Sequence, residues 1–197
     1  LDHIEYLYGV GATGVALELW GDTLAFCLDG TIVDQELKLR TYVPGDTASV
    51  QRANWRSTCS GFPLDVDFLG REVAVATGCG VEIWDVSNPD APRLSDEWDA
   101  PSGLLESVVL TPDLVIASSW ADSLYVLDRT GPELRRIAVT MLNARADVQL
   151  GHDAAGRPHV VCNLSIDGYV VYPLREGRLA RAPAPPPELW GFGAHEN

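Results

Sequence analysis

Short apolar runs return along this 197-residue chain at intervals of 41 to 49 residues, and this repeat restricts the fold more than any other feature. Each run follows a short alternating run that ends in a turn-forming residue, and each is followed by a third run and a weaker fourth one. The four apolar runs are Leu24 to Cys27, Val73 to Ala76, Leu114 to Ala117 and His159 to Cys162. Four β-runs in a unit of this length are typical of the four-stranded antiparallel blade of a β-propeller. No segment keeps a helical apolar period, so we predict an all-β fold with very little helix.

The repeat divides the chain into four predicted blades and two terminal segments. The blades are expected near residues 15–50, 63–103, 104–142 and 144–181, and the Pro-rich residues 182–197 form a tail. Residues 1–9 resemble a surplus outer strand, and residues 45–61 resemble a long insertion. Two arrangements fit this division: a closed four-bladed ring, or part of a larger propeller to which further blades of the same parent chain belong.

The second unit contains the clearest motif, GVEIWDVSNPDAP, from Gly80 to Pro92. We predict that Asp85, Ser87, Asn88 and Pro89 form a structural turn, because Asp and Asn side chains accept hydrogen bonds from backbone amides two residues on and Pro restricts φ. The motif and the VAVA run before it resemble the LVIVP repeat of bacterial and archaeal secreted or surface propellers. The resemblance implies an extracytoplasmic protein that is secreted, periplasmic or displayed on the cell surface.

Charge excludes two classes of partner. The chain has 28 acidic and 14 basic residues, a formal net charge of −14. Such a surface repels phosphate backbones and anionic lipid headgroups, so neither nucleic acid nor a membrane surface is an expected partner. No apolar run is long enough for a transmembrane helix, so membrane insertion is not expected either.

The four cysteines do not have the spacing of a zinc site. Cys27 and Cys162 lie within apolar runs and are predicted to be buried. Cys59 and Cys79 flank a pair of predicted strands. They either form a disulfide in an oxidising compartment or remain free thiols, and the sequence leaves both states open.

No metal, cofactor or catalytic motif stands out. His152, Asp153 and His159 are the residues that most resemble a metal cluster, but their spacing is not that of a known site, so no metal site is predicted. Calcium is compatible only with the general acidity of the chain, because no loop has closely spaced oxygen ligands. The carboxylate pair Asp65 and Asp67 has residue types used in glycoside hydrolysis, but chance pairs are expected among 28 carboxylates.

Aromatic and basic residues give the candidate binding surface. Trp55 lies between Arg52 and Arg56 in the one locally basic patch, and Trp120 lies at a predicted turn. Exposed Trp can stack on a sugar or anchor a peptide. We therefore expect a noncatalytic propeller module that binds protein or carbohydrate. Two alternatives stay open: a fragment of a propeller hydrolase or oxidoreductase with its site near the central channel, and a cytoplasmic WD-like scaffold.

Overall fold

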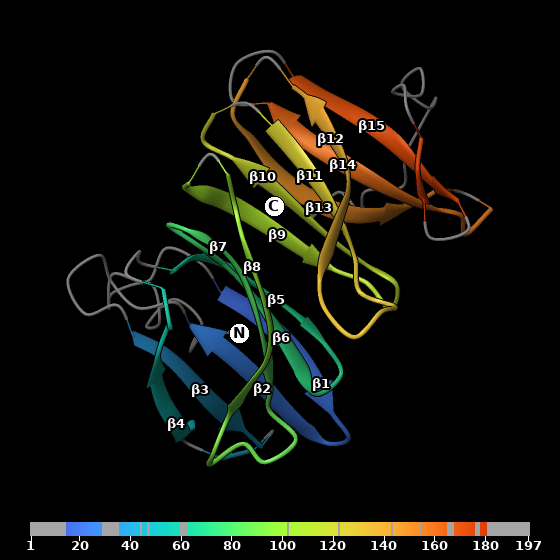
Figure 1. Cartoon of the computed structure of the whole chain (residues 1–197). Helices are drawn as coiled ribbons and strands as arrows, with labels where there is room; N and C mark the ends of the chain where they lie inside the picture. The colour runs from blue at the N-terminus through green and yellow to red at the C-terminus, as the bar shows by residue number, and fades with distance from the viewer. Residues whose placement is uncertain are drawn as a thin grey trace.

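The structure is a computed structural model that describes residues 15–28, 36–43, 45–46, 48–59, 63–101, 103–121, 123–142, 144–153, 155–164, 168–175 and 178–180. Every regular element in these ranges is a β-strand, and the strands form four four-stranded antiparallel sheets (Figure 1). We number the sheets 1 to 4 in chain order. The prediction of an all-β fold built from four-stranded units is confirmed.

Each sheet is a meander whose strands are neighbours in the order of the sequence. Sheet 1 contains β1 (Val15–Trp20), β2 (Thr23–Leu28), β3 (Glu36–Tyr42) and β4 (Val50–Arg56). Sheet 2 contains β5 (Pro63–Leu69), β6 (Glu72–Thr77), β7 (Gly80–Asp85) and β8 (Arg93–Asp99). Sheet 3 contains β9 (Leu105–Leu110), β10 (Leu114–Ser119), β11 (Ser123–Asp128) and β12 (Arg135–Met141). Sheet 4 contains β13 (Ala146–His152), β14 (Pro158–Leu164), β15 (Gly168–Arg175) and β16 (Arg178–Leu179).

The main departure from the sequence prediction is in sheet 1. Strand β4 lies within residues 45–61, which were expected to be an insertion, so the first sheet extends to Arg56. The sequence of β4 is mostly polar and therefore did not indicate a strand. Only two of its side chains, Ala53 and Trp55, pack against the core between sheets 1 and 2. The surplus strand expected at residues 1–9 and the tail at 182–197 lie outside the described residues.

The second strands of sheets 2 and 3 explain how the sheets stack. All side chains of β10 are buried, as are those of β6 from Val73 to Thr77. A strand that is apolar on both faces needs a neighbour on each side. Accordingly, three hydrophobic clusters lie between sheets 1 and 2, sheets 2 and 3, and sheets 3 and 4. Burial of apolar surface between successive sheets therefore holds the four units together.

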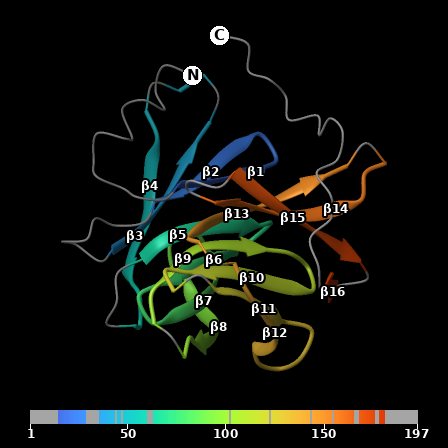
Figure 2. The ribbon, with the colours of Figure 1, turned by 90° about the horizontal axis from the view of Figure 1, so that it is seen from above.

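The first strands of consecutive sheets lie next to each other. Contacts join β1 to β5, β5 to β9 and β9 to β13, whereas the fourth strands of sheets 2 and 3 lie at the periphery (Figure 2). Within the described strands, no comparable contact joins β13 back to β1. The sheets thus form a consecutive series with their first strands inside.

The predicted turn after β7 is confirmed. The N–H of Ser87 donates to Asp85 Oδ1 at 2.8 Å, and the N–H of Asp90 donates to Asn88 Oδ1 at 3.2 Å. Hydrogen bonds from Ser87 lower the pKa of Asp85. Asp128 repeats the arrangement after β11, where the N–H of Thr130 donates to its Oδ1 at 2.9 Å. These aspartates therefore stabilise the turns between third and fourth strands.

Candidate functional site

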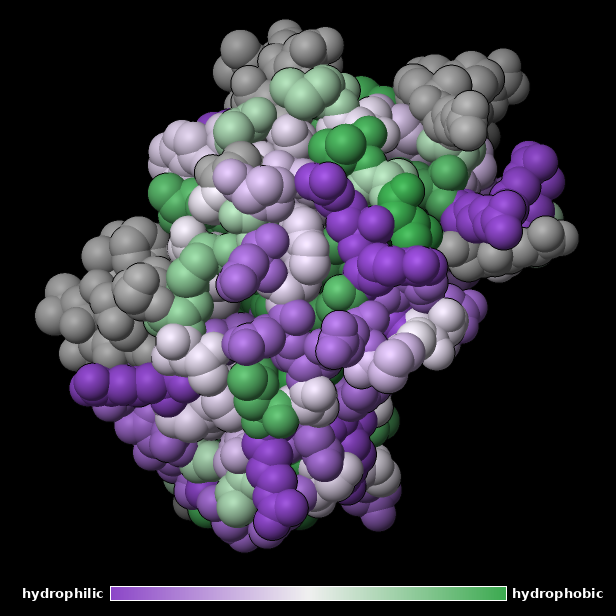
Figure 3. Space-filling model, in the orientation of Figure 1, coloured by the Kyte–Doolittle hydropathy of each residue, from purple (hydrophilic) through white to green (hydrophobic). Residues whose placement is uncertain are grey.

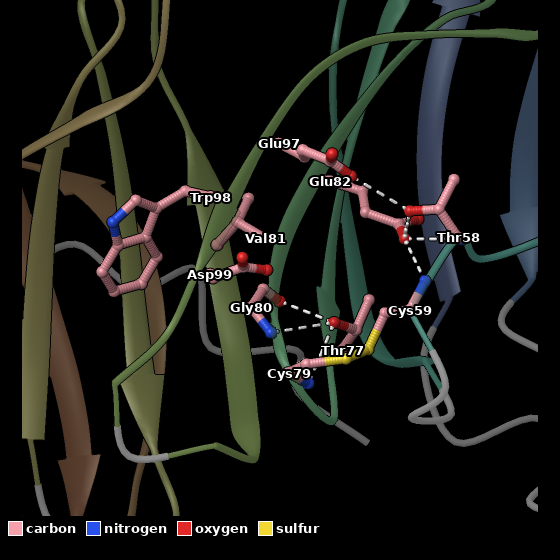
Figure 4. Close-up of a pocket in the computed structure, with 10 residues that line it drawn as sticks. All are labelled: Thr58, Cys59, Thr77, Cys79, Gly80, Val81, Glu82, Glu97, Trp98 and Asp99. Atoms are coloured by element: carbon pink, nitrogen blue, oxygen red, sulfur yellow. Dashed lines mark hydrogen bonds between the residues drawn. A yellow bond between two sulfur atoms is a disulfide. The ribbon is translucent and has the colours of Figure 1, made fainter.

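A pocket of about 270 Å³ lies where the loop after β4 meets the ends of β6, β7 and β8 (Figure 4). It contains three carboxylates, those of Glu82, Glu97 and Asp99. Glu82 projects from β7, and the other two come from the outer strand β8. The pocket is therefore acidic and lies between sheet 2 and the segment that connects sheet 1 to it.

Glu82 is buried, with 2% of its surface exposed, yet it is fully hydrogen-bonded. Its Oε1 accepts hydrogen bonds from Ser57 Oγ, Thr58 N–H and Thr58 Oγ1, each at 2.7 Å, and from Cys59 N–H at 3.1 Å. Its Oε2 accepts one from Trp84 Nε1 at 2.9 Å. These donors replace the water that a buried carboxylate loses. Glu82 thus holds the loop after β4 onto sheet 2 and has little capacity left for a ligand.

A disulfide between Cys59 and Cys79 adds a covalent link at the same place. It joins the loop after β4 to the turn between β6 and β7, across 20 residues of sequence. Of the two states that the sequence left open, the structure forms the disulfide. Cys162 is a free, buried cysteine as predicted, and burial raises the pKa of its thiol to about 12. Cys27 lies in β2, but its side chain is outside the described part of the structure.

Two features define what the pocket can bind. Thr58 Oγ1 lies between Glu82 Oε1 and Glu97 Oε2, at 2.7 and 3.1 Å, and its one hydrogen can serve only one of them at a time. The indole of Trp98 points away from the pocket, and its ring packs 5.2 Å from that of Tyr125 (Figure 4). The pocket therefore offers acceptors for a small cationic or donor group, and its described lining residues form no aromatic platform for a sugar.

The Asp65 and Asp67 pair lies on the first strand of sheet 2 and reaches to the first strand of sheet 3. Asp65 Oδ2 accepts hydrogen bonds from Ser107 Oγ at 2.8 Å and Val108 N–H at 2.9 Å. Asp67 Oδ2 accepts one from Leu110 N–H at 2.8 Å. Burial raises the pKa of Asp65 to about 6, although the bonds from Val108 and Ser107 oppose the shift. Burial also raises the pKa of Asp67.

These hydrogen bonds give Asp65 and Asp67 a structural role. The edge of β9 that faces sheet 2 has backbone N–H groups without an acceptor in sheet 3. In that sheet β9 pairs only with β10, which lies at its other edge. The carboxylates of β5 satisfy two of these N–H groups. Ser107 repeats the pattern one sheet further on, where its Oγ accepts the N–H of Val148 in β13 at 3.1 Å. Side chains of one first strand thus cap the backbone of the next.

The structure separates the members of the predicted basic patch. Arg52 donates from Nε and Nη2 to the two carboxylate oxygens of Asp90, at 2.9 and 2.8 Å, and links β4 to the turn after β7. Trp55 is half-buried in the cluster between sheets 1 and 2, 5.7 Å from the ring of Trp84. Arg56 is exposed, with Nη2 3.7 Å from Glu36. Two of the three predicted residues therefore connect sheets, and Arg56 is the most exposed of the three.

Trp120 lies in the turn between β10 and β11, and half of its surface is exposed. The guanidinium of Arg145 lies 3.4 Å from the centre of its ring. Arg145 in turn forms an ion pair with Glu106 of β9. One face of the indole is therefore covered by a cation, which is favourable for the electron-rich ring, while the remaining surface is open to a ligand.

The structure does not bring together the three residues that most resembled a metal cluster. His152 pairs with Pro158 and His159 with Gly151, so the two imidazoles leave the hairpin on opposite faces. Asp153 accepts hydrogen bonds from the N–H groups of Ala155 and Arg157, each at 2.9 Å, and from Arg157 Nε at 2.6 Å. Within the described ranges, no group of three or more His, Cys, Asp or Glu side chains is placed to hold a metal ion.

Two features were missed by sequence reasoning. Glu82 carries a detectable signal, because it is an acidic residue within the apolar run GVEIWD. Its partners Ser57 to Cys59 carry none, since they lie more than 20 residues away in a segment without periodicity. The second feature is the exposed apolar surface of β12, formed by Ile137, Val139 and Met141.

The comparisons with known proteins identify a fold and no family. No protein-family model matches the chain. No curated protein is significantly similar to it in sequence. A crystal structure described as that of the computationally designed Ika4 protein superposes with a TM-score of 0.59 and 11% sequence identity. The superposition covers 82% of this chain and 90% of the designed one. At this identity the likeness concerns the fold alone, and a fold does not define an activity.

The described residues include no helix of the length and apolar character that crossing a membrane requires.

Proposed function

We propose that this chain is a noncatalytic β-propeller module that binds protein or carbohydrate. The propeller arrangement is supported by the four meander sheets, by the adjacency of their first strands and by the peripheral position of outer strands such as β8 and β12. A closed four-bladed ring and an arc of a larger propeller both agree with these contacts. The LVIVP-type repeat remains a proposed affiliation that rests on Gly80 to Pro92.

The hydrogen bonds of the interior carboxylates are the observation that supports a noncatalytic function. Glu82, Asp65 and Asp67 all accept hydrogen bonds from this chain's own backbone or side chains. A general acid or base must reach a substrate proton, and these groups hold loops and strands instead. Their arrangement supports a scaffold that presents its surface, with Trp120 as one exposed aromatic residue.

An extracytoplasmic location is part of the proposal. The disulfide between Cys59 and Cys79 supports it, because disulfides persist in oxidising compartments and are rare in the cytosol of most organisms. Mass spectrometry of the protein from its native cells, alkylated before lysis, provides the test. We expect a linked peptide containing Cys59 and Cys79. Alkylation of both thiols would contradict the location.

One observation favours the alternative of a propeller enzyme. Asp65 lies on a first strand with a pKa of about 6, and a raised pKa is typical of catalytic acids. The intact chain should therefore be tested on a glycan array and on a panel of glycosidase and esterase substrates. We expect binding without turnover. Turnover that disappears in Asp65→Asn while the fold survives would establish the enzyme instead.

A further inference from the structure

The outer strand of sheet 3 exposes an unusual amount of apolar surface. In β12, Ile137, Val139 and Met141 are 44%, 51% and 62% exposed. Figure 3 shows hydrophobic patches over this part of the molecule, next to hydrophilic ones. The outer strand of sheet 2 differs, because its exposed positions are Arg93, Ser95, Glu97 and Asp99. Charged side chains on edge strands are the usual protection against unwanted pairing, and the C-terminal half of β12 lacks them.

The edge of β12 is also free to pair. The strand stands at the end of the order β12-β11-β10-β9, so its far edge has no strand beside it among the described residues. Val139 lies opposite Tyr125 and Met141 opposite Ser123 in the register with β11. These side chains therefore share the face on which Tyr125 packs against Trp98. A strand added at this edge would extend an apolar face that already exists.

The beginning of β12 supplies charge. Arg135 and Arg136 are both exposed, in a chain whose net charge is −14. Arg135 Nη2 lies 3.3 Å from Asp128 Oδ2, whereas Arg136 has no carboxylate within ion-pair distance in the described part of the chain. Arg136 is thus an exposed cation at one end of the apolar row, where a carboxylate of a partner can pair with it.

We infer that β12 is a docking site for an extended segment of a partner protein, which pairs with its free edge by strand addition. Apolar residues at alternate positions of the segment would contact Val139 and Met141. A carboxylate of the segment would lie beside Arg136. Backbone hydrogen bonds supply affinity in this mode, and alternate side chains supply specificity. The inference deepens the proposed binding function and rests on it.

A second copy of this chain fits the site less well than a partner segment. Two copies with a net charge of −14 each repel one another. In an antiparallel self-pairing centred on Ala138, Arg135 would face Met141 and Arg136 would face Thr140, so neither arginine would gain a counter-charge. A partner that contributes a carboxylate satisfies Arg136 directly.

The test uses two labelled peptides in which Val alternates with Thr, one with Glu at both ends and the other with Lys at both ends. Fluorescence anisotropy measures their binding to the intact protein. We expect the Glu-ended peptide to bind at least tenfold more tightly than the Lys-ended one. Val139→Lys should weaken this binding at least tenfold, and Arg136→Glu should remove or reverse the preference for Glu.

Val50→Lys provides a matched control, because Val50 is 56% exposed on β4, the outer strand of sheet 1. This variant should bind the Glu-ended peptide as the unmodified protein does. Equal binding by the Val139 and Val50 variants, or no binding by the unmodified protein, would overturn the inference. A dimer that sedimentation shows to depend on Val139 would assign the site to a second copy and overturn it too. If the unmodified protein binds a ligand on the array but not the Glu-ended peptide, the general binding function stands and the β12 site does not.

Discussion

The carbonyl oxygen of Trp98 occupies the place where a Cβ atom on Gly80 would stand. Gly80 begins β7 and lies opposite Asp99 in the register with β8, at the edge of the acidic pocket. The two backbones approach so closely that only hydrogen fits between them. The glycine is therefore required by a contact between neighbouring strands and not by its φ angle.

Replacing Gly80 with Ala should destabilise the protein by about 1 to 3 kcal/mol, because the backbone of β8 must move to admit the methyl group. Chemical denaturation measures this change. Gly131→Ala is the control, since a Cβ there would meet nothing closer than Glu133 O at 3.8 Å. Equal stabilities of the two variants would show that β7 and β8 are not as close as described.

Asp65 should make stability depend on pH. Its folded pKa of about 6 lies above the ordinary value of 3.8, so the folded state prefers the protonated acid. The stability that this carboxyl contributes is therefore present at low pH and is lost as the pH rises from about 4 through 6. Asp65→Asn keeps an acceptor for Val108 N–H but does not titrate.

We accordingly expect the Asp65→Asn variant to gain stability relative to the unmodified protein as the pH rises from 4 to 7. The gain should be of the order of 2 kcal/mol. Urea denaturation at each pH is the measurement, with Asp113→Asn on an exposed turn as the control. Parallel pH profiles for Asp65→Asn and the unmodified protein would contradict the effect of burial on Asp65.

Reduction of the disulfide should destabilise the protein by about 3 kcal/mol, the value expected for closing a loop of about 20 residues. Thermal unfolding with and without dithiothreitol measures the loss. The double variant Cys59→Ser, Cys79→Ser should unfold at the lower temperature under both conditions. A reductant effect that persists in the double variant would have to come from another cysteine.

Removing the Glu82 carboxylate should release the loop after β4. In Glu82→Ala, the donors of Ser57, Thr58, Cys59 and Trp84 lose their acceptor, which costs about 3 kcal/mol or more in total. Hydrogen exchange of the Thr58 and Cys59 amides should rise far more than that of amides in β10. Glu82→Gln keeps one acceptor oxygen and should show a smaller effect. Unchanged protection of Thr58 in Glu82→Ala would refute this role.

Local periodicity made the sheets predictable. The apolar runs at Val73 to Ala76 and Leu114 to Ala117 form the buried strands β6 and β10, and the Asp85 turn closes as its sequence indicates. These features depend on neighbours within a few residues, because strand alternation and side-chain capping are short-range effects. The sequence alone therefore predicts four four-stranded units and an all-β fold.

Contacts between the units were decided only by tertiary structure. Trp55 and Arg52 form a basic aromatic patch in the sequence, yet one packs on Trp84 and the other pairs with Asp90. The bond from Val108 to Asp65 and those from Thr58 to Glu82 join residues 43 and 24 positions apart. Whether a side chain meets a neighbouring sheet or solvent depends on how the sheets face one another. No short-range pattern contains that information, because the partner surface is created only when the sheets pack.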